Sequence, residues 1–174
     1  TGDSHQTLTP LLAELQTTGS EPSFVLIDGD HTYHSVKRDV EAMLKFVKAR
    51  SLYMLMHDSF NPDCRQGIRD ANWVGNPYVH YVELDFVPGN ISDHPSFYRQ
   101  MWAGLALAIL LPTARQSDLI IQASHEALFR IVLAQSAHQS PLNKVRRQLR
   151  HLRKIWRGHA VERLKLPESV NQSG

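Results

Sequence analysis

The 174-residue sequence has only one cysteine, Cys64, and contains no glycine-rich G-x-G-x-G pattern. A single cysteine excludes an intrachain disulfide framework and suits a reducing compartment, so we expect a cytoplasmic protein. No apolar run approaches the ~20 residues that a membrane-spanning helix requires. The longest run, residues 103–112, reads as a core element instead. With 42% hydrophobic and 21% charged residues, the composition is that of a globular protein.

The basic residues are concentrated near the end of the chain. Nine of the nineteen lysines and arginines lie within residues 144–165, against one acid, while the rest of the chain has 10 basic and 16 acidic residues. Such a basic helix could bind a polyanion. Its apolar positions need a protein surface to cover them, however, so we favour packing or oligomerisation and do not expect a nucleic-acid partner. These apolar positions are Val145, Leu149, Leu152 and Trp156.

Alternating strand and helix patterns predict an α/β domain with a largely parallel sheet. The first strand is a continuous apolar run, which predicts burial on both faces. The last two strands are expected to form an antiparallel hairpin at one edge of the sheet, with Gly104 marking a close backbone approach. In chain order the predicted elements are a helix at residues 7–15 beginning near Pro10, a strand at 23–27, a helix at 34–48, a strand at 52–56, a helix at 64–73, and strands at 78–87 and 101–111.

Beyond Pro112 the pattern becomes helical. Ser117 is a suitable N-cap for a helix to residue 137, and Pro141 opens a final helix. The sequence therefore predicts three parts. They are a sheet domain over residues 1–112, a helical extension over 113–166 and a disordered tail over 167–174.

Polar clusters follow two neighbouring strands at the points where these strands end. The letters DGDH occupy residues 28–31, and HD occupies residues 57–58. Because ligands of open α/β sheets bind outside the carboxyl ends of the strands, we expect the two clusters to converge at a site. Asp28 and Asp58 offer hard oxygen ligands to a divalent cation, and His31 is a residue type suited to act as a base near neutral pH.

Each cluster also has a purely structural interpretation. Asp28 and Asp30 could serve as turn and cap residues where the chain passes from strand to helix, with Thr32 capping that helix. His31 could be a solvated loop histidine. Asp58 could hydrogen-bond loop amides and hold the end of its strand.

The segment IDGDHTY at residues 27–33, followed by an amphipathic helix and a strand ending in HD, resembles a bacterial methyltransferase family. That family depends on S-adenosylmethionine and groups with the cephalosporin-hydroxylase-like and macrolide-sugar O-methyltransferases. The resemblance implies a Rossmann-like sheet that ends in an antiparallel hairpin, and methyl transfer to a hydroxyl of a small molecule or sugar. It also implies that Asp28 lies in the cofactor site and binds magnesium, and that His31 is the catalytic base.

The same resemblance identifies further site residues. The relatives carry an acidic pair where this chain has His57 and Asp58. Asp58 matches as a metal ligand, whereas His57 would be a nitrogen ligand that suits manganese, zinc or iron better than magnesium. Upstream, GDS at residues 2–4 resembles the segment whose acidic residue lies beside the adenine ring, so Asp3 is a candidate cofactor contact.

The resemblance covers residues 2–111, which correspond to the carboxyl-terminal part of such a domain, without its glycine-rich cofactor turn. A sheet that begins there has an apolar parallel edge, so we expect a homo-oligomer or a missing amino-terminal segment. Two other functions are open. One is a non-catalytic remnant of the fold that serves as an interaction or oligomerisation module. The other is a metallohydrolase, which would need more histidine ligands at the strand ends.

Overall fold

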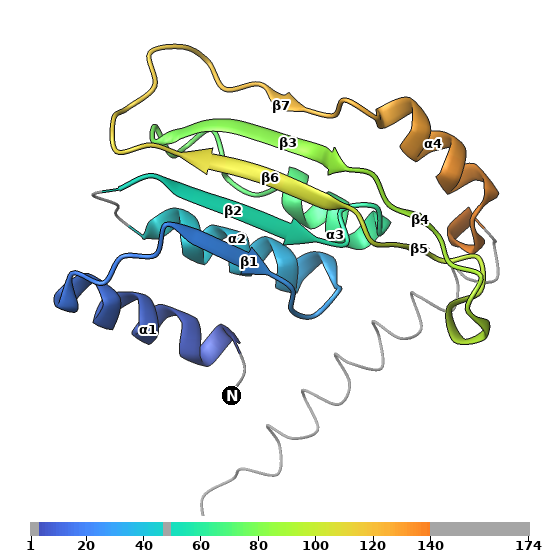
Figure 1. The fold of residues 1–174 in the computed structure, drawn as a ribbon, viewed down its shortest axis with the longest axis horizontal. Helices are drawn as coiled ribbons and strands as arrows, with labels where there is room; N and C mark the ends of the chain where they lie inside the picture. The colour runs from blue at the N-terminus through green and yellow to red at the C-terminus, as the bar shows by residue number, and fades with distance from the viewer. Residues whose placement is uncertain (1–3, 47–49, 140–174) are drawn as a thin grey trace, which may run out of the picture.

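The computed structural model describes residues 4–46 and 50–139, which form a mixed α/β fold (Figure 1). A five-stranded sheet has the order β1-β2-β6-β3-β7, and β4 and β5 form a separate pair. Figure 1 shows α2 and α3 lying along the same side of the sheet. The elements are α1 (Ser4–Thr18), β1 (Phe24–Ile27), α2 (Tyr33–Lys45), β2 (Leu52–His57), α3 (Pro62–Arg69), β3 (Val79–Val87), β4 (Asn90–Ile91), η1 (Pro95–Phe97), β5 (Met101–Trp102), β6 (Leu105–Leu110), β7 (Ile121–Gln122), α4 (Glu126–Gln135) and η2 (Ala137–Gln139).

Four of the five strands run in the same direction, which confirms a mostly parallel sheet. β1 pairs in parallel with β2 and β3 with β7, while β6 runs antiparallel to both of its neighbours. The antiparallel pairing of β3 with β6 is therefore confirmed. Its predicted position at an edge is wrong, because β6 inserts between β2 and β3 and the short β7 lies outside β3. The small buried side chains of Ala106 and Ala108 leave room for the helices over this central strand.

The predicted strand at residues 101–111 is two strands in the structure. Ala103 and Gly104 separate them, with positive φ angles of 60° and 82° that no extended strand adopts. A Cβ atom on Gly104 would lie 2.9 Å from the Ser59 Oγ and 3.1 Å from the Gly89 nitrogen. The predicted close approach at Gly104 is therefore confirmed, and it forms the corner from which β6 starts.

The prediction that the first strand is buried on both faces is wrong. Phe24 and Leu26 are 56% and 52% exposed, and Tyr53 of the neighbouring strand is 46% exposed. Phe24 lies opposite Tyr53 in the parallel pairing, so these side chains share one face of the sheet. α2 and α3 cover the other face, and within the described residues β1 pairs only with β2. One apolar face of this edge is consequently open.

Three helix predictions need correction. α1 already includes Ser4, so Pro10 lies inside the helix and not at its start. α3 begins at Pro62, which Asn61 precedes as the N-cap, and ends at Arg69 instead of continuing to residue 73. The helix expected from Ser117 begins only at Glu126, because residues 121–122 pair with β3. The helix expected from Pro141 and the tail at 167–174 lie outside the described residues.

The second helix follows its prediction closely. Thr32 caps α2 by accepting a hydrogen bond from the Ser35 amide at 3.4 Å, and Phe46 is the C-cap. The apolar positions Val36, Val40 and Met43 are buried against the sheet. The amphipathic spacing was sufficient to predict this helix, because one side of α2 packs on the core and the other faces water.

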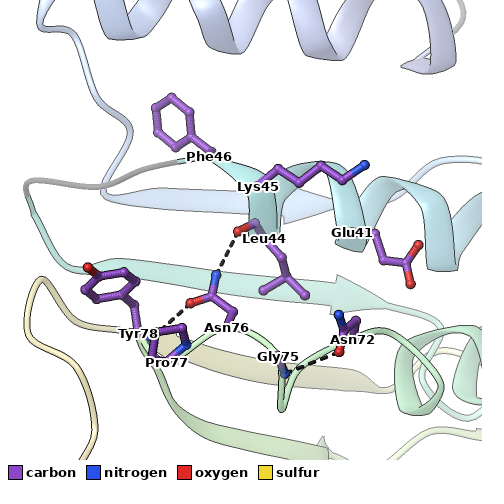
Figure 2. Close-up of a pocket in the computed structure, with 9 residues that line it drawn as sticks. All are labelled: Glu41, Leu44, Lys45, Phe46, Asn72, Gly75, Asn76, Pro77 and Tyr78. Atoms are coloured by element: carbon purple, nitrogen blue, oxygen red, sulfur yellow. Dashed lines mark hydrogen bonds between the residues drawn. The ribbon is translucent and has the colours of Figure 1, made fainter.

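A hollow of about 440 Å³ lies at the amino ends of β2 and β3, between the end of α2 and the loop that precedes β3 (Figure 2). Asn76 holds this loop in place by donating a hydrogen bond to the Leu44 carbonyl at 2.7 Å. The hollow is at the opposite end of the sheet from the DGDH and HD clusters. Its lining residues are Glu41, Leu44, Lys45, Phe46, Asn72, Gly75, Asn76, Pro77 and Tyr78.

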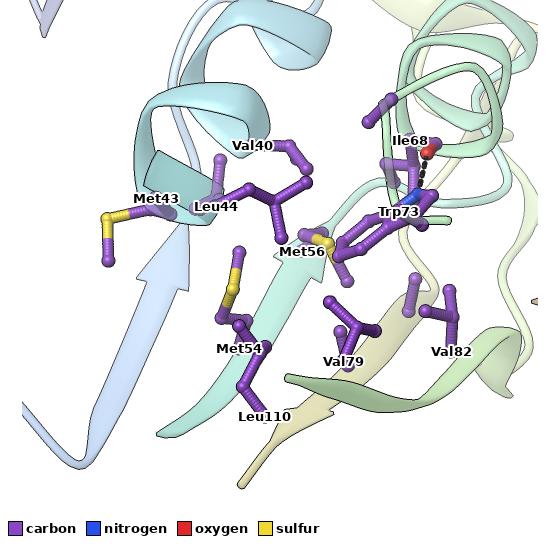
Figure 3. Packing of buried hydrophobic residues seen from close by; sticks show 14 of the residues in the cluster. Val40, Met43, Leu44, Met54, Met56, Ile68, Trp73, Val79, Val82 and Leu110 are labelled. Carbon is purple, nitrogen blue, oxygen red and sulfur yellow. Dashed lines mark hydrogen bonds between the residues drawn. The ribbon is translucent and has the colours of Figure 1, made fainter. Parts of the chain in front are cut away.

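The core fills the space between the sheet and the two helices α2 and α3 (Figure 3). Trp73 is fully buried although it lies beyond the end of α3, and its indole donates a hydrogen bond to the Ile68 carbonyl at 2.6 Å. Met54 and Met56, at alternate positions of β2, are fully buried in the same cluster, and Figure 3 shows Met56 beside the Trp73 ring. The labelled core residues are Val40, Met43, Leu44, Met54, Met56, Ile68, Trp73, Val79, Val82 and Leu110.

A buried arginine joins α3, β3 and α4. The Arg65 side chain is 3% exposed and hydrogen-bonds both oxygens of Asp85, whose side chain is fully buried. The Arg65 Nη2 also lies 2.8 Å from the Glu126 carboxylate, and the Arg65 guanidinium lies 4.2 Å from the centre of the Phe129 ring. This network fixes α4 against the carboxyl end of β3.

No helix in the described part of the chain is long and apolar enough to cross a membrane.

We expect Arg65→Met to lower the free energy of unfolding by about 3 kcal/mol, because it leaves the Asp85 carboxylate buried without its partner. Arg130→Met is the matched control. Arg130 contacts the same Glu126 but is 76% exposed, so its loss should cost less than about 1 kcal/mol. Urea unfolding measures both values. Equal effects of the two substitutions would contradict the structural role of the buried pair.

Stability should fall in acid because of Glu126. Burial alone would raise the pKa of Glu126, but hydrogen bonds from Arg65 and Arg130 outweigh it and hold that pKa below its usual value of 4.5. A lowered folded-state pKa means that the stabilisation is complete above pH 4.5 and is lost as the pH falls through the lowered pKa. Glu126→Gln should therefore reduce the loss of stability between neutral and acidic pH, measured by urea unfolding at each pH. An unchanged pH dependence would count against this network.

Candidate functional site

The carboxyl ends of β1 and β2 lie side by side, because these strands pair in parallel with Ile27 opposite Met56. Asp28 and His57 follow directly, and the His57 Nδ1 lies 3.2 Å from the Asp28 Oδ1. The two polar clusters, far apart in the sequence, thus converge in space as expected. This end of the sheet is the candidate functional site.

Asp58 is the most constrained residue of the site. Its φ of 56° is in the left-handed region, and the residue is 3% exposed. Its Oδ1 accepts a hydrogen bond from the Ala103 amide at 2.6 Å, and its Oδ2 lies 2.7 Å from the His31 Nε2. One oxygen therefore holds the loop, as the structural interpretation of Asp58 expects, while the other orients an imidazole.

His31 is held by the turn that begins α2. The Asp30 Oδ2 accepts hydrogen bonds at 2.9 Å from the hydroxyls of Thr32 and Ser35. Asp30 thus belongs to the capping network of the helix, which agrees with the structural interpretation for this residue. The turn fixes the backbone on either side of His31, so its imidazole is presented toward Asp58 and not simply solvated.

Three side chains of the site have the chemistry and spacing of metal ligands. Asp28, His31 and His57 each offer one ligand atom, and these three atoms lie within 4.8 Å of one another. Their side chains are 48%, 39% and 37% exposed, so an ion could enter. Asp58 lies at the same point, with its Oδ2 3.4 Å from the His57 Nδ1. Two nitrogens and one or two carboxylate oxygens suit zinc, manganese or iron better than magnesium.

An aromatic wall, formed by Trp102 and Phe97, borders the site on the side of the β4–β5 segment. The Trp102 ring meets the His31 ring edge-on, with centroids 5.3 Å apart and an angle of 85°. Phe97 packs on Trp102 in the same manner at 5.4 Å. Sequence reasoning missed both residues, because no local pattern links them to the DGDH cluster. The only sequence feature that pointed to this region was Gly104, which indicated that another part of the chain closely approaches the backbone next to Trp102.

The single cysteine lies near the site but is not suited to be its nucleophile. Cys64 is fully buried in α3. Burial, followed by the nearby carboxylates of Asp58 and Asp30, raises its pKa to about 12. The thiol is therefore protonated at neutral pH and unreactive. The chemistry of the site belongs to its carboxylates and imidazoles.

Of the predicted cofactor residues, Asp28 is in the site and Asp3 lies outside the described residues. Asp28, His57 and Asp58, the predicted metal ligands, are brought together with the predicted base His31. No family model, curated protein or solved structure matches the chain.

We expect the site to bind Zn²⁺ more tightly than Mg²⁺, as measured by calorimetric titration, because imidazole nitrogens prefer the softer ion. His57→Gln should weaken zinc binding by at least about tenfold. His80→Gln is the matched control, since His80 contacts the Thr113 carbonyl away from the site. If both substitutions have the same effect, zinc binds elsewhere and the proposed ligand set is wrong.

Proposed function

We propose that this chain carries the acceptor-activating side of an S-adenosylmethionine-dependent O-methyltransferase that acts on a hydroxyl of a small molecule or sugar. The observation that carries the proposal is the 2.7 Å contact between His31 and the buried Asp58. It lies at the carboxyl ends of two parallel strands, where open α/β sheets bind their ligands.

In this proposal His31 is the general base. If its Nε2 proton is donated to Asp58, the imidazole keeps a lone pair on Nδ1 that takes the proton of the acceptor hydroxyl. The Asp58 carboxylate then stabilises the imidazolium that forms, and the Ala103 amide keeps this carboxylate in position. When bound, S-adenosylmethionine would supply an electrophilic methyl group on a sulfonium centre.

Two features of the fold agree with what the resemblance implies. The β3–β6 pair is an antiparallel hairpin within an otherwise parallel sheet. The IDGDHTY and HD segments both lie at the carboxyl ends of neighbouring strands. A mixed α/β fold alone would not favour methyl transfer, since many functions share it. The combination of the hairpin with these two segments favours this family over others.

The cofactor half of the site requires residues beyond those that the structure describes. β1 pairs only with β2 among the described residues, and its side chains Phe24 and Leu26 are exposed. An unpaired apolar edge strand of this kind accepts further strands. We propose that strands carrying a glycine-rich turn, which this sequence does not contain, pair here and are supplied by a longer polypeptide. Asp28, at the end of β1, would then face the cofactor.

A metal ion held by residues of this site is the proposed alternative to base catalysis by His31. Asp28, His31 and His57 would hold it, with nitrogen ligands that favour zinc or manganese. Bound there, the ion would polarise the acceptor hydroxyl and make its proton easier to remove. In that state His31 serves as a ligand and Asp58 as its orienting carboxylate, so the metal and base roles of His31 are alternatives.

One observation favours a second candidate, a metal-dependent hydrolase. Such a site needs several histidine ligands, and the structure brings both His31 and His57 to Asp28. A metal-bound water would be the nucleophile in that case. Hydrolysis of an ester or phosphoester by the zinc-loaded chain, without any binding of S-adenosylhomocysteine, would favour this candidate over methyl transfer.

The test of the leading proposal is calorimetric titration with S-adenosylhomocysteine, with and without Zn²⁺, of this chain together with the strands that carry the glycine-rich turn. We expect binding. His31→Gln should leave that binding intact but lower methyl transfer to a responsive hydroxyl compound by about 10²–10⁴-fold, as expected for loss of a general base. Failure of that assembly to bind S-adenosylhomocysteine would contradict the proposal and favour a non-catalytic interaction module.

A further inference from the structure

Buried polar atoms without a hydrogen bond occur on both segments that meet at one contact of this fold. Among the described residues, four buried side-chain atoms make no hydrogen bond, and three of them belong to His57, Ser59 and Trp102, although carboxylate oxygens of Asp28 and Asp58 lie 3.2 Å and 3.4 Å from the His57 Nδ1. These residues flank the contact between Asp58 and Ala103. A fold seldom leaves buried polar atoms unpaired, and a cluster of them calls for an explanation such as an absent ligand. The fourth, the Arg65 Nε, belongs to a guanidinium whose other nitrogens are bound.

The unpaired atom of Trp102 restricts what such a ligand can be. An indole Nε1–H can only donate a hydrogen bond, so its partner must be an acceptor. Ser59 is fully buried, and its hydroxyl can donate or accept. A ligand that satisfies Trp102 therefore presents an oxygen, or another acceptor atom, close to the His31 imidazole that the indole contacts.

The surroundings of Trp102 favour a ring on that ligand. Phe97 packs edge-on against the indole, and 46% of the phenylalanine remains exposed. A flat molecule gains apolar and ring contacts against such a wall. Trp102 directly precedes the Ala103–Gly104 corner, where two consecutive positive φ angles turn the chain.

We propose that Trp102 determines which acceptor the site takes. It does so by donating its indole hydrogen bond to an oxygen of a hydroxylated ring that lies against Trp102 and Phe97. This inference rests on the proposed function, in which His31 removes a proton from that acceptor. The ring is a phenol or a sugar, because both classes present an apolar face, either an aromatic face or a face of C–H groups, with oxygens beside it.

The test follows the indole N–H signals of the full, ¹⁵N-labelled chain by NMR while catechol or methyl α-D-glucopyranoside is added. Trp102→Phe identifies the Trp102 signal by its loss. We expect one of the two probes to move that proton signal downfield, as a new hydrogen bond requires. The Trp73 indole already donates to Ile68 and should not move. Toluene, a ring without oxygen, should cause no downfield shift.

Affinity measurements on variants separate a specific subsite from general binding. Trp102→Phe keeps an aromatic ring but loses the donor, and it should weaken binding of the responding probe by roughly five- to tenfold. Phe97→Leu should weaken it by about threefold. Tyr78→Phe, in the distant hollow, should have no effect.

Response to catechol identifies a phenolic acceptor and response to the glucoside a sugar, and either supports the inference. An unmoved Trp102 signal with both probes at millimolar concentration overturns it, as does equal binding by Trp102→Phe. Probe binding without S-adenosylhomocysteine binding would remove the methyltransferase proposal but keep this subsite. The reverse result would remove the subsite alone.

Discussion

The two hydrogen-bonding directions of the Asp58 carboxylate organise this end of the molecule. Oδ1 accepts the Ala103 amide and so ties the end of β2 to the corner that precedes β6. Oδ2 meets the His31 imidazole at the start of α2. A single buried side chain thus sets the positions of an imidazole and of the Trp102 ring beside it. The left-handed backbone conformation of Asp58 is tolerated because both of its carboxylate oxygens are held by contacts with surrounding residues.

The strand order explains why this contact exists. β6 lies between β2 and β3, so its first residue, Leu105, pairs with His57 at the end of β2. The corner before β6 must therefore lie beside Asp58. An edge position for β6 would have moved the aromatic wall away from β2, and the site would consist of polar residues alone. The central place of an antiparallel strand is thus a condition for the contact between the His31 and Trp102 rings.

Different parts of the sheet are secured to different degrees. At the carboxyl end of β3, Arg65 binds Asp85 and Glu126, and α4 is fixed there by charge and by ring contact. At the opposite edge of the sheet, Phe24 and Leu26 are exposed on β1. The site lies at the β1 and β2 strand ends, next to this open edge. The described residues therefore order the His31–Asp58 side of the site, whereas β1 beside it has an unpaired edge among them.

Local sequence patterns were sufficient for the α/β class, for α2 and for the convergence of the DGDH and HD clusters. These features follow from helical and strand periodicity and from the rule that parallel strands end together. Patterns could not predict which strand lies between which, because pairing is a property of the whole sheet. The insertion of β6, the open face at Phe24 and the contact of Trp102 with His31 were decided by tertiary structure alone. They depend on long-range packing and on the burial of one carboxylate, Asp58, that no local pattern reveals.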